Sequence, residues 1–206
     1  TALSMAVTVL GAYVLSRRKL FWKRFLSLAC LFTMFFSGGL IPLYLQVLRL
    51  NIMDSMWALL LPACVNTFNL MVMRTSFAAL PEALDESARI DGANDLVLLA
   101  RIVIPLSLPI LAVIFLFYFV AQWNAWFHAM LFLKTRSKYP LQLVLREILI
   151  ISNQDSMLAG ASQGDRQDLG VTIKYAVIII ATLPITCMYP FLQRFFVKGI
   201  MVGAIK

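Results

Sequence analysis

The chain has 206 residues, of which 61% are hydrophobic and 14% are charged, and its formal net charge is +8 at pH 7. Soluble domains carry roughly a quarter of charged residues, so this chain lacks the polar groups needed to cover a surface in water. The composition excludes an ordinary soluble domain and predicts one all-α domain, residues 1–206, folded as a polytopic bundle of membrane helices.

The first predicted elements are five apolar stretches, of which the last four are long enough to cross roughly 30 Å of hydrocarbon as a helix. The first of them is short, yet it has neither the basic start nor the cleavage site of a signal peptide. We expect it to be the end of a span that begins outside this sequence. Prolines within the stretches predict kinked helices in a bundle. The spans are expected at about residues 1–15, 25–48, 55–77, 102–133 and 171–194.

The basic loop after the first span, "SRRKLFWKR" at residues 16–24, contains no acidic residue. By the positive-inside rule it is cytoplasmic. Alternation of the spans then places residues 81–101 and the tail, 195–206, inside, and residues 134–170 outside. The expected location is a cell membrane, with residues 81–101 and the tail on its cytoplasmic side.

The positive charge itself predicts no nucleic-acid partner. Most basic residues lie beside the spans, where they bind the anionic headgroups of membrane lipid, and no nucleic-acid-binding module is present. Cys30, Cys64 and Cys187 lie singly in apolar stretches, and His128 is the only histidine. We therefore expect no metal, no cofactor and no catalytic residue in this chain.

Half of the ten acidic residues fall within one segment, "PEALDESARIDGANDLVLLARIVIP" at residues 81–105. Pro81 and the carboxylates after it are typical of a helix N-terminus. Gly92 then predicts a bend, and Asn94 or Asp95 can cap a second helix that enters the membrane at Ile102. The residues alone favour a solvated connecting loop and a docking segment about equally.

The spacing in this segment resembles the E-A-A-x3-G-x9-I-x-L-P signature of permease subunits in binding-protein-dependent ABC importers. Ser87 replaces one of the two alanines and Ile104 the leucine, while Glu86, Ala88, Gly92 and Pro105 match. The resemblance implies that the segment is the coupling helix that docks on an ATPase subunit. The implied docking residues are Glu82, Asp85, Glu86, Ser87, Ala88, Asp91 and Gly92.

The resemblance extends to residues 121–131, typical of carbohydrate-type permeases, and to 193–206, similar to the tail of maltose-type (MalG-like) subunits. Residues 138–150 resemble the LplC/YtcP-type branch, which is linked with complex oligosaccharides. The implied fold is the type I importer permease fold. The implied partners are a second permease, two ATPase subunits that hold ATP and Mg, and an extracytoplasmic solute-binding protein.

Polar residues inside spans are costly and tend to face a cavity or another helix. Amides can bond sugar hydroxyls, and indoles can cover sugar C–H patches. By their four-residue spacing, Gln122 and Trp126 are expected on one helix face. The alternative is that amides join helices and tryptophans mark the membrane interface. The candidate path residues are Asn66, Asn69, Gln122, Trp123, Asn124 and Trp126.

Other functions stay open at this point. Lys134, Arg136 and Lys138 suit either an acidic cargo or an ordinary solvated loop, and residues 153–170 are expected to form a flexible loop. A permease for a non-sugar solute is the main alternative to an oligosaccharide importer. A passive channel or secondary carrier is disfavoured, because the spans hold almost no ionisable residue near mid-membrane.

Overall fold

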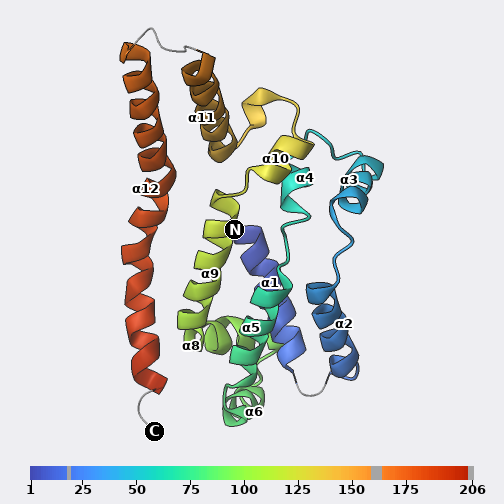
Figure 1. Cartoon of the computed structure of the whole chain (residues 1–206). Coiled ribbons are helices and arrows are strands. Elements are labelled where there is room, and N and C mark those ends of the chain that lie inside the picture. The colour runs from blue at the N-terminus through green and yellow to red at the C-terminus, as the bar shows by residue number, and fades with distance from the viewer. Residues whose placement is uncertain (18–19, 159–163, 204–206) are drawn as a thin grey trace.

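The computed structural model describes the backbone of residues 1–17, 20–158 and 164–203, and side-chain surroundings for 1–17, 20–151, 171–191 and 193. Every regular element in these residues is helical, which confirms the all-α prediction (Figure 1). The first half comprises α1 (Ala2–Ser16), α2 (Lys23–Phe35), α3 (Leu40–Arg49), α4 (Met56–Leu60), α5 (Thr67–Ala78) and α6 (Glu82–Ile90). The second comprises α7 (Asp95–Leu98), the π-helical η1 (Leu99–Val103), α8 (Ile104–Leu106), α9 (Leu108–Trp123), α10 (Phe127–Phe132), the 3-10 turn η2 (Arg136–Lys138), α11 (Leu141–Leu158) and α12 (Gly164–Gly203).

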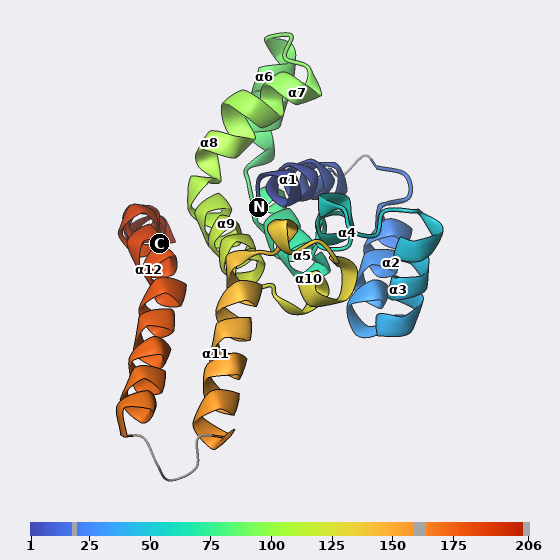
Figure 2. The ribbon, with the colours of Figure 1, turned by 90° about the horizontal axis from the view of Figure 1, so that it is seen from above.

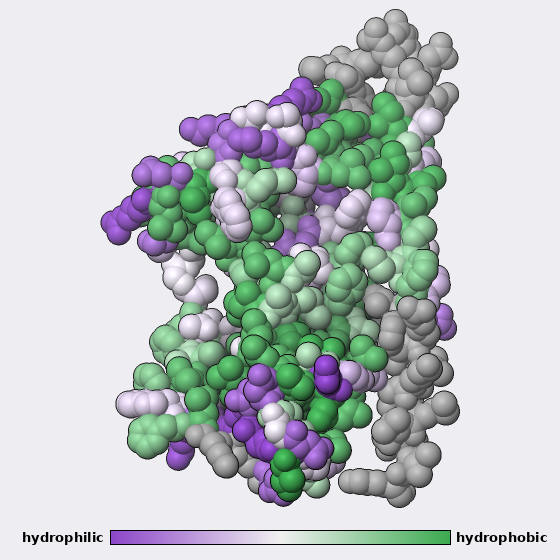
Figure 3. Space-filling model, turned by 180° about the vertical axis from the view of Figure 1, so that it is seen from behind, coloured by the Kyte–Doolittle hydropathy of each residue, from purple (hydrophilic) through white to green (hydrophobic). Residues whose placement is uncertain are grey.

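These helices form two tiers, which we call the lower bundle and the upper cluster (Figure 1). In the lower bundle, α1, α5 and α9 enclose a core that includes Ala12, Met73 and Ile114, all 0% exposed. The upper cluster packs α3, α4 and α10 around Val47 and Phe132, and α10 against the start of α11. On the face shown in Figure 3, hydrophilic residues gather towards the two ends with a hydrophobic band between them, as expected for a membrane protein.

The two tiers meet where three of the predicted spans are broken. The range 25–48 is divided into α2 and α3, which are bent by 113° around Gly38 and Gly39, and Gly39 has a φ of 85°. The range 55–77 is interrupted between α4 and α5, and 102–133 between α9 and α10. By length and composition, one described helix can cross a membrane unbroken, or up to three if each bent pair counts as one. The five-span count stays a prediction.

The helix that follows the acidic segment bends sharply before it continues into the predicted span 102–133, as the prolines in that span predict. Asp95–Leu106 and Leu108–Trp123 meet at 86°, and Ser107 between them is 4% exposed. Pro105 and Pro109 flank this elbow, and each lacks the N–H that would continue the helical ladder. Seen from above, α6, α7 and α8 therefore extend to one side of the bundle (Figure 2).

The longest element, α12, runs for 40 residues beside α9 and α11. Its segment Val171–Phe191 is long and apolar enough to span a membrane. The flexible loop predicted at 153–170 is wrong where the backbone is described, because α11 continues to Leu158 and α12 starts at Gly164. The predicted tail is likewise helical up to Gly203, and its last residues lie outside the described part.

Candidate functional site

The acidic segment folds as its sequence predicts. Pro81 precedes α6, with Glu82 and Asp85 in the first turn, where negative charge offsets the partial positive charge of the helix N-terminus. Gly92 has a φ of 80°, a conformation that favours glycine, and it ends the helix in a bend. Asn94 begins α7, and its Oδ1 accepts a 2.8 Å hydrogen bond from the amide of Val97. The result is two short helices at nearly the extreme end of the lower bundle (Figure 1).

The predicted docking residues differ in their exposure. Glu82, Glu86, Ser87, Asp91 and Gly92 are exposed, and Asp85 is half-buried. Ala88 is 5% exposed and lies in the core of the lower bundle, where its carbonyl accepts the amide of Ala93 at 2.9 Å. Ala88 therefore faces the chain itself, whereas the other predicted docking residues offer surface to a partner.

Large apolar side chains are exposed among these carboxylates. Ile90 is 86% exposed and Leu96 is 70% exposed, and Leu84 on the same segment is 37% exposed. An apolar centre within a charged rim is typical of a protein–protein contact rather than of a solvated loop. The exposed side chains fit a docking segment, and the choice between docking and a solvated loop stays a prediction.

An ionic network ties this segment to the C-terminal end of α1, and no local sequence pattern predicts it. Nη1 of Arg17 lies 2.6 Å from Oδ1 of Asp85. Arg89 bridges the two helices of the segment, with Nη2 at 2.6 Å from Oδ1 of Asp95 and Nε at 3.5 Å from Oδ2 of Asp85. Tyr13 donates to the main-chain oxygen of Asp95 at 2.9 Å and accepts from Arg17.

The carboxylates of this network favour the charged form of Arg89, which lies between them. The carboxylates of Asp85 and, next in effect, Asp95 raise the pKa of Arg89 above its ordinary value. Two further cations meet the end of α1, because Lys23 donates to the carbonyl of Ser16 at 3.0 Å and Arg74 to that of Leu15 at 3.3 Å. The end of α1 is thus held by cations from neighbouring elements, where the helix dipole is negative.

Of the predicted path residues, Asn66, Asn69 and Gln122 come together at the break before α5. The Asn66 side chain caps that helix by accepting the amide of Asn69 at 3.0 Å. Gln122 reaches the carbonyl of Ala63 at 3.5 Å. These contacts are those of amides that satisfy backbone groups freed by a broken helix, and a role in sugar contact stays a prediction.

Three residues outside the predicted path set, Tyr118, Thr8 and Ser4, complete this polar layer. The hydroxyl of Tyr118 accepts the amide of Asn66 at 3.0 Å and lies 2.7 Å from Oγ1 of Thr8 in a buried contact. Tyr118 precedes Gln122 by one helical turn, and Ser4, which donates to Ala63 at 3.3 Å, precedes Thr8 by one turn. Paired polar residues at four-residue spacing in α1 and α9 were the available signal.

The other path residues point elsewhere, and the shared face of Gln122 and Trp126 is a wrong prediction. Helix α9 ends at Trp123, so Trp126 lies beyond the break, where its ring is covered by the guanidinium of Arg146 at 3.3 Å. Trp123 donates to the carbonyl of Ala181 at 2.9 Å and thus joins α9 to α12. Asn124 folds back onto Val120 at 3.0 Å.

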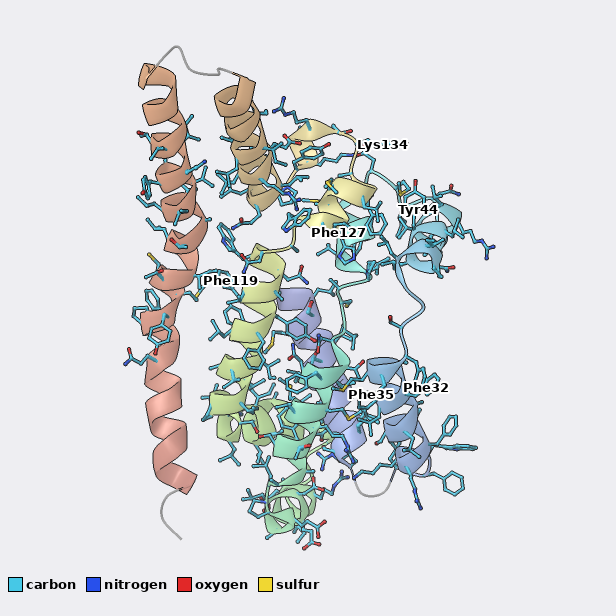
Figure 4. All side chains as sticks on the ribbon, viewed as in Figure 1. Phe32, Phe35, Tyr44, Phe119, Phe127 and Lys134 are labelled. Atoms are coloured by element: carbon cyan, nitrogen blue, oxygen red, sulfur yellow. The ribbon has the colours of Figure 1, made fainter. Side chains whose placement is uncertain are left out.

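Aromatic side chains at the end of α9 support the assignment of Trp123 as a link between α9 and α12. Phe119, on the side of α9 that faces α12 in Figure 4, stacks with Trp123 at a centroid distance of 6.5 Å. Aromatic packing and one indole hydrogen bond hold the long helix here. Trp123 therefore acts in the structure as a joint between helices.

At the opposite end of the molecule, Asp54 clasps the two loops of the upper cluster. Its carboxylate accepts the amides of Lys134 and Thr135 at 2.9 and 3.0 Å and the Thr135 hydroxyl at 2.5 Å. The Lys138 ammonium lies 3.1 Å from the same carboxylate. The Thr135 bonds, followed by the Lys134 amide and Lys138, hold the pKa of Asp54 well below its usual range.

Two of the three basic residues considered for an acidic cargo already form ion pairs within the chain. Lys138 is engaged by Asp54, and Arg136 lies 3.6 Å from Glu147. Lys134 is exposed at the top of the molecule (Figure 4). No three His, Cys, Asp or Glu side chains gather as metal ligands in the described part of the chain.

Comparison with known proteins assigns this architecture. Residues 5–202 match the family described as "Binding-protein-dependent transport system inner membrane component". The chain is 45% identical to the polygalacturonan/rhamnogalacturonan transport system permease protein YtcP of Bacillus subtilis, over all of this chain and 72% of that protein. It is 43% identical to LplC of the same organism, over all of this chain and 70% of LplC.

This chain is also similar to a solved structure of the same class of transporter. That structure is of a bacterial ABC transporter involved in the import of the acidic polysaccharide alginate, and one of its chains matches with a TM-score of 0.81 and 30% identity. The match covers 95% of this chain and 70% of that one. Together, the helical architecture, the bent acidic segment and these likenesses show that the chain belongs to the family of inner-membrane permease components of binding-protein-dependent transport systems.

Proposed function

We propose that this chain is the permease subunit of an ATP-driven importer, and that residues 81–101 dock on a separate ATPase subunit. The observation that carries the proposal is the exposed pair Ile90 and Leu96 within a carboxylate-rich segment. A cleft on the partner that is apolar inside and basic at its rim would bury both side chains and meet Glu82, Glu86 and Asp91. ATP and Mg would lie on that partner, which alone would hydrolyse the nucleotide.

The proposed orientation puts the docking segment in the cytoplasm. Arg17, at the start of the basic loop, lies at the same end of the bundle as α6, because it pairs with Asp85. With this end in the cytoplasm, the basic residues of the loop follow the positive-inside rule. The Asp54 clasp, at the other end, would face an extracytoplasmic binding protein that delivers the cargo.

We propose an oligosaccharide as the cargo. The named relatives support this class, since one carries polygalacturonan or rhamnogalacturonan in its name and another belongs to an alginate importer. A non-sugar solute remains the alternative cargo, because the docking segment does not encode what is carried. The proposed path runs between this chain and a second, homologous permease, past the break near Asn66 and Gln122.

In the proposed mechanism, closure of the ATPase pair moves α6 and, through it, the lower bundle. A ligand or nucleotide shifts such an equilibrium only by its difference in affinity for the two states. The link must therefore be stiff, and the contacts of Arg17 with Asp85 and of Arg89 with both helices of the segment provide that stiffness. The elbow at Ser107 would pass the movement to α9.

Site-specific crosslinking tests the docking directly. A photoreactive residue at Ile90, which is 86% exposed, should capture an ATP-binding neighbour in membranes, and the adduct can be identified by mass spectrometry. The same residue at Leu98, which is 2% exposed on the same segment, should capture only this chain. If position 90 captures no nucleotide-binding subunit while the protein is assembled, the docking proposal is wrong.

Cargo is tested with the assembled complex in vesicles. ATP hydrolysis should rise when its binding protein is supplied together with an oligosaccharide that the complex carries, and not with the binding protein alone. Oligogalacturonides are the first probes to try, with amino acids and ions as the alternative arm. Uptake that persists without ATP would contradict the importer and favour a channel or secondary carrier.

A further inference from the structure

A groove at the junction of α1, α2 and α5 has no part in the proposed transport cycle. It measures about 470 Å³ and lies at the same end of the molecule as α6. Its lining comprises Leu20, Phe21, Lys23, Arg24, Ser27, Leu28 and Arg74. Cationic side chains from two different helices thus converge on one small hollow at the proposed cytoplasmic end.

The two arginines of this groove carry charges that no carboxylate in the described residues neutralises. Arg24 is exposed, and Arg74 uses Nε to donate to the carbonyl of Leu15. Neither guanidinium has a carboxylate partner in the part of the chain that the structure describes. The planar fork of arginine suits the oxygens of a phosphate, which it can bind through two parallel hydrogen bonds.

A buried hydroxyl lines the same groove. Ser27 is 8% exposed, and its Oγ is buried without a hydrogen-bond partner in the described structure. Buried polar groups normally have partners, because an unpaired one costs about 1–3 kcal/mol. Ser27 is therefore a second, independent sign that a polar group of a ligand enters here.

An apolar groove continues from the cationic one along α2. It measures about 540 Å³, and Leu28 lines both grooves. Phe32 and Phe35 line its far part and lie on the outer side of the bundle, away from α12 (Figure 4). A charged hollow that adjoins an open apolar face of one helix matches a phosphate headgroup followed by an acyl chain.

Exposed aromatic residues show where the membrane surface meets this groove. Phe21 is 92% exposed, Trp22 60% and Phe25 63%, all at the start of α2. Aromatic side chains concentrate at the headgroup level of bilayers. A basic pocket beside such residues, between helices on the proposed cytoplasmic side, favours an anionic lipid over a soluble acidic protein.

We infer that this groove binds one anionic phospholipid of the inner leaflet, with its phosphate on Arg24, Arg74 and Ser27 and an acyl chain along α2. Lys23 closes the hollow from the side, where its ammonium also bonds the carbonyl of Ser16. The ligand connects the end of α1 to α2 and α5, which places it beside the Arg17–Asp85 link. Only the choice of leaflet rests on the proposed function.

The test is photocrosslinking with a phosphatidylglycerol that carries a photoreactive acyl chain, added to the full protein in the assembly in which it purifies. Adducts should map to residues 20–36, and they should be weaker with the matched phosphatidylcholine. Arg24→Gln should lower the yield about fivefold, as expected for one cation at a charged membrane surface. Arg101→Gln, an exposed arginine outside the groove, should leave it unchanged.

A second variant guards against failure to fold. Leu28 is 57% exposed, so Leu28→Asp adds a negative charge at the junction of the grooves without disturbing the core, and it should also lower the yield. Equal yields in both variants and the wild type would overturn the inference, as would displacement of the lipid by inorganic phosphate or capture of an acidic protein in its place. Crosslinking of the ATPase at Ile90 is measured in a separate experiment. Failure of the docking proposal and failure of the lipid proposal can therefore be told apart.

Discussion

Nη1 of Arg17 lies 2.6 Å from Oδ1 of Asp85, although the two residues are 68 positions apart in the sequence. The contact joins the end of α1 to the first turn of α6, so that the docking segment is held to the bundle by more than its own chain connections. Both side chains are partly shielded from water, with 23% and 33% of their surface exposed. The pair is the shortest described ionic route from the docking segment into a neighbouring helix.

Removal of this contact should loosen the segment. Asp85→Asn should lower the apparent Tm of the purified complex by about 2–4 °C, because a partly exposed ion pair contributes about 1 kcal/mol. It should also lower uptake per ATP hydrolysed. Glu147→Gln removes another partly exposed carboxylate, paired with Arg136 at 3.6 Å and outside the docking segment, and should leave the coupling ratio unchanged. A complex whose Tm and coupling ratio both survive Asp85→Asn would show that the contact has no mechanical role.

The bend at Gly92 should depend on the left-handed backbone conformation of this residue and not on the room available for a side chain. No atom lies within 4 Å of a Cβ added there, but φ is +80°. Gly92→Val should cost about 1–2 kcal/mol in the local fold, whereas Gly92→Asn should cost less, since asparagine tolerates this conformation. Uptake by the assembled complex should therefore fall more with valine than with asparagine.

Gly38→Ala provides the control for that series, because the nearest atom to its added Cβ is 3.8 Å away and no left-handed φ is involved. Its uptake should match the wild type. Equal uptake by the valine and asparagine variants of Gly92 would contradict a role for the left-handed bend.

The buried hydroxyl of Tyr118 should stabilise the junction between tiers. Tyr118→Phe leaves Thr8 and the amide of Asn66 without their partner, at a cost of about 1–3 kcal/mol, which can be measured as a lower apparent Tm. The double variant Tyr118→Phe/Thr8→Val should recover part of that loss. Tyr44→Phe is the control, because Tyr44 stacks on Phe132 and makes no described hydrogen bond through its hydroxyl. Equal losses in both tyrosine variants would exclude a specific role for the Tyr118 bond.

The Asp54 clasp should persist in mild acid. Because its folded pKa lies below the unfolded value, the contribution of Asp54 is present above the unfolded pKa and is lost only as the pH falls through the lower, folded pKa. Amide hydrogen exchange at Lys134 and Thr135, corrected for the intrinsic rate, should therefore stay slow from pH 7 to about 4. Asp54→Asn should speed it throughout, and Asp91→Asn should not. Loss of protection near pH 4 in the wild type would contradict the clasp.

Two of the predicted path residues, Gln122 and Trp126, should differ in their effect on uptake. Gln122→Ala should alter the KM for uptake or the stability, since the amide lies in the polar layer near the proposed path. Trp126→Phe should leave the KM unchanged, because one face of the ring is already covered by Arg146 and the side chain packs in the upper cluster. A raised KM for Trp126→Phe with unchanged stability would restore it as a sugar contact.

Sequence reasoning succeeded where local rules decide the structure. The acidic segment could be predicted residue by residue, because Pro81, Gly92 and Asn94 act through their own backbone and the neighbouring turn. It failed where distant elements decide it. Helix α9 ends after Trp123 in an apolar range with no glycine or proline near the break, so nothing local predicted that Trp126 would leave the face of Gln122.

The loop predicted at 153–170 failed for a related reason. Its polar residues and glycines are typical of a loop, yet α11 and α12 extend into it from both sides and pack against each other. Long-range ion pairs such as that between Arg17 and Asp85 were also invisible, because periodicity reports which face a residue occupies and not which helix lies opposite.

The unbroken course of α12 has a practical consequence for distance measurements. Its 40 residues correspond to about 60 Å at 1.5 Å per residue, which is about twice the hydrocarbon thickness of a bilayer. A helix of this length exceeds the hydrocarbon layer, whereas the neighbouring α9 stops at Trp123. Spin labels near its two ends would give a nearly constant reference length, against which labels on α3 or α6 would reveal tilting and opening as separate movements.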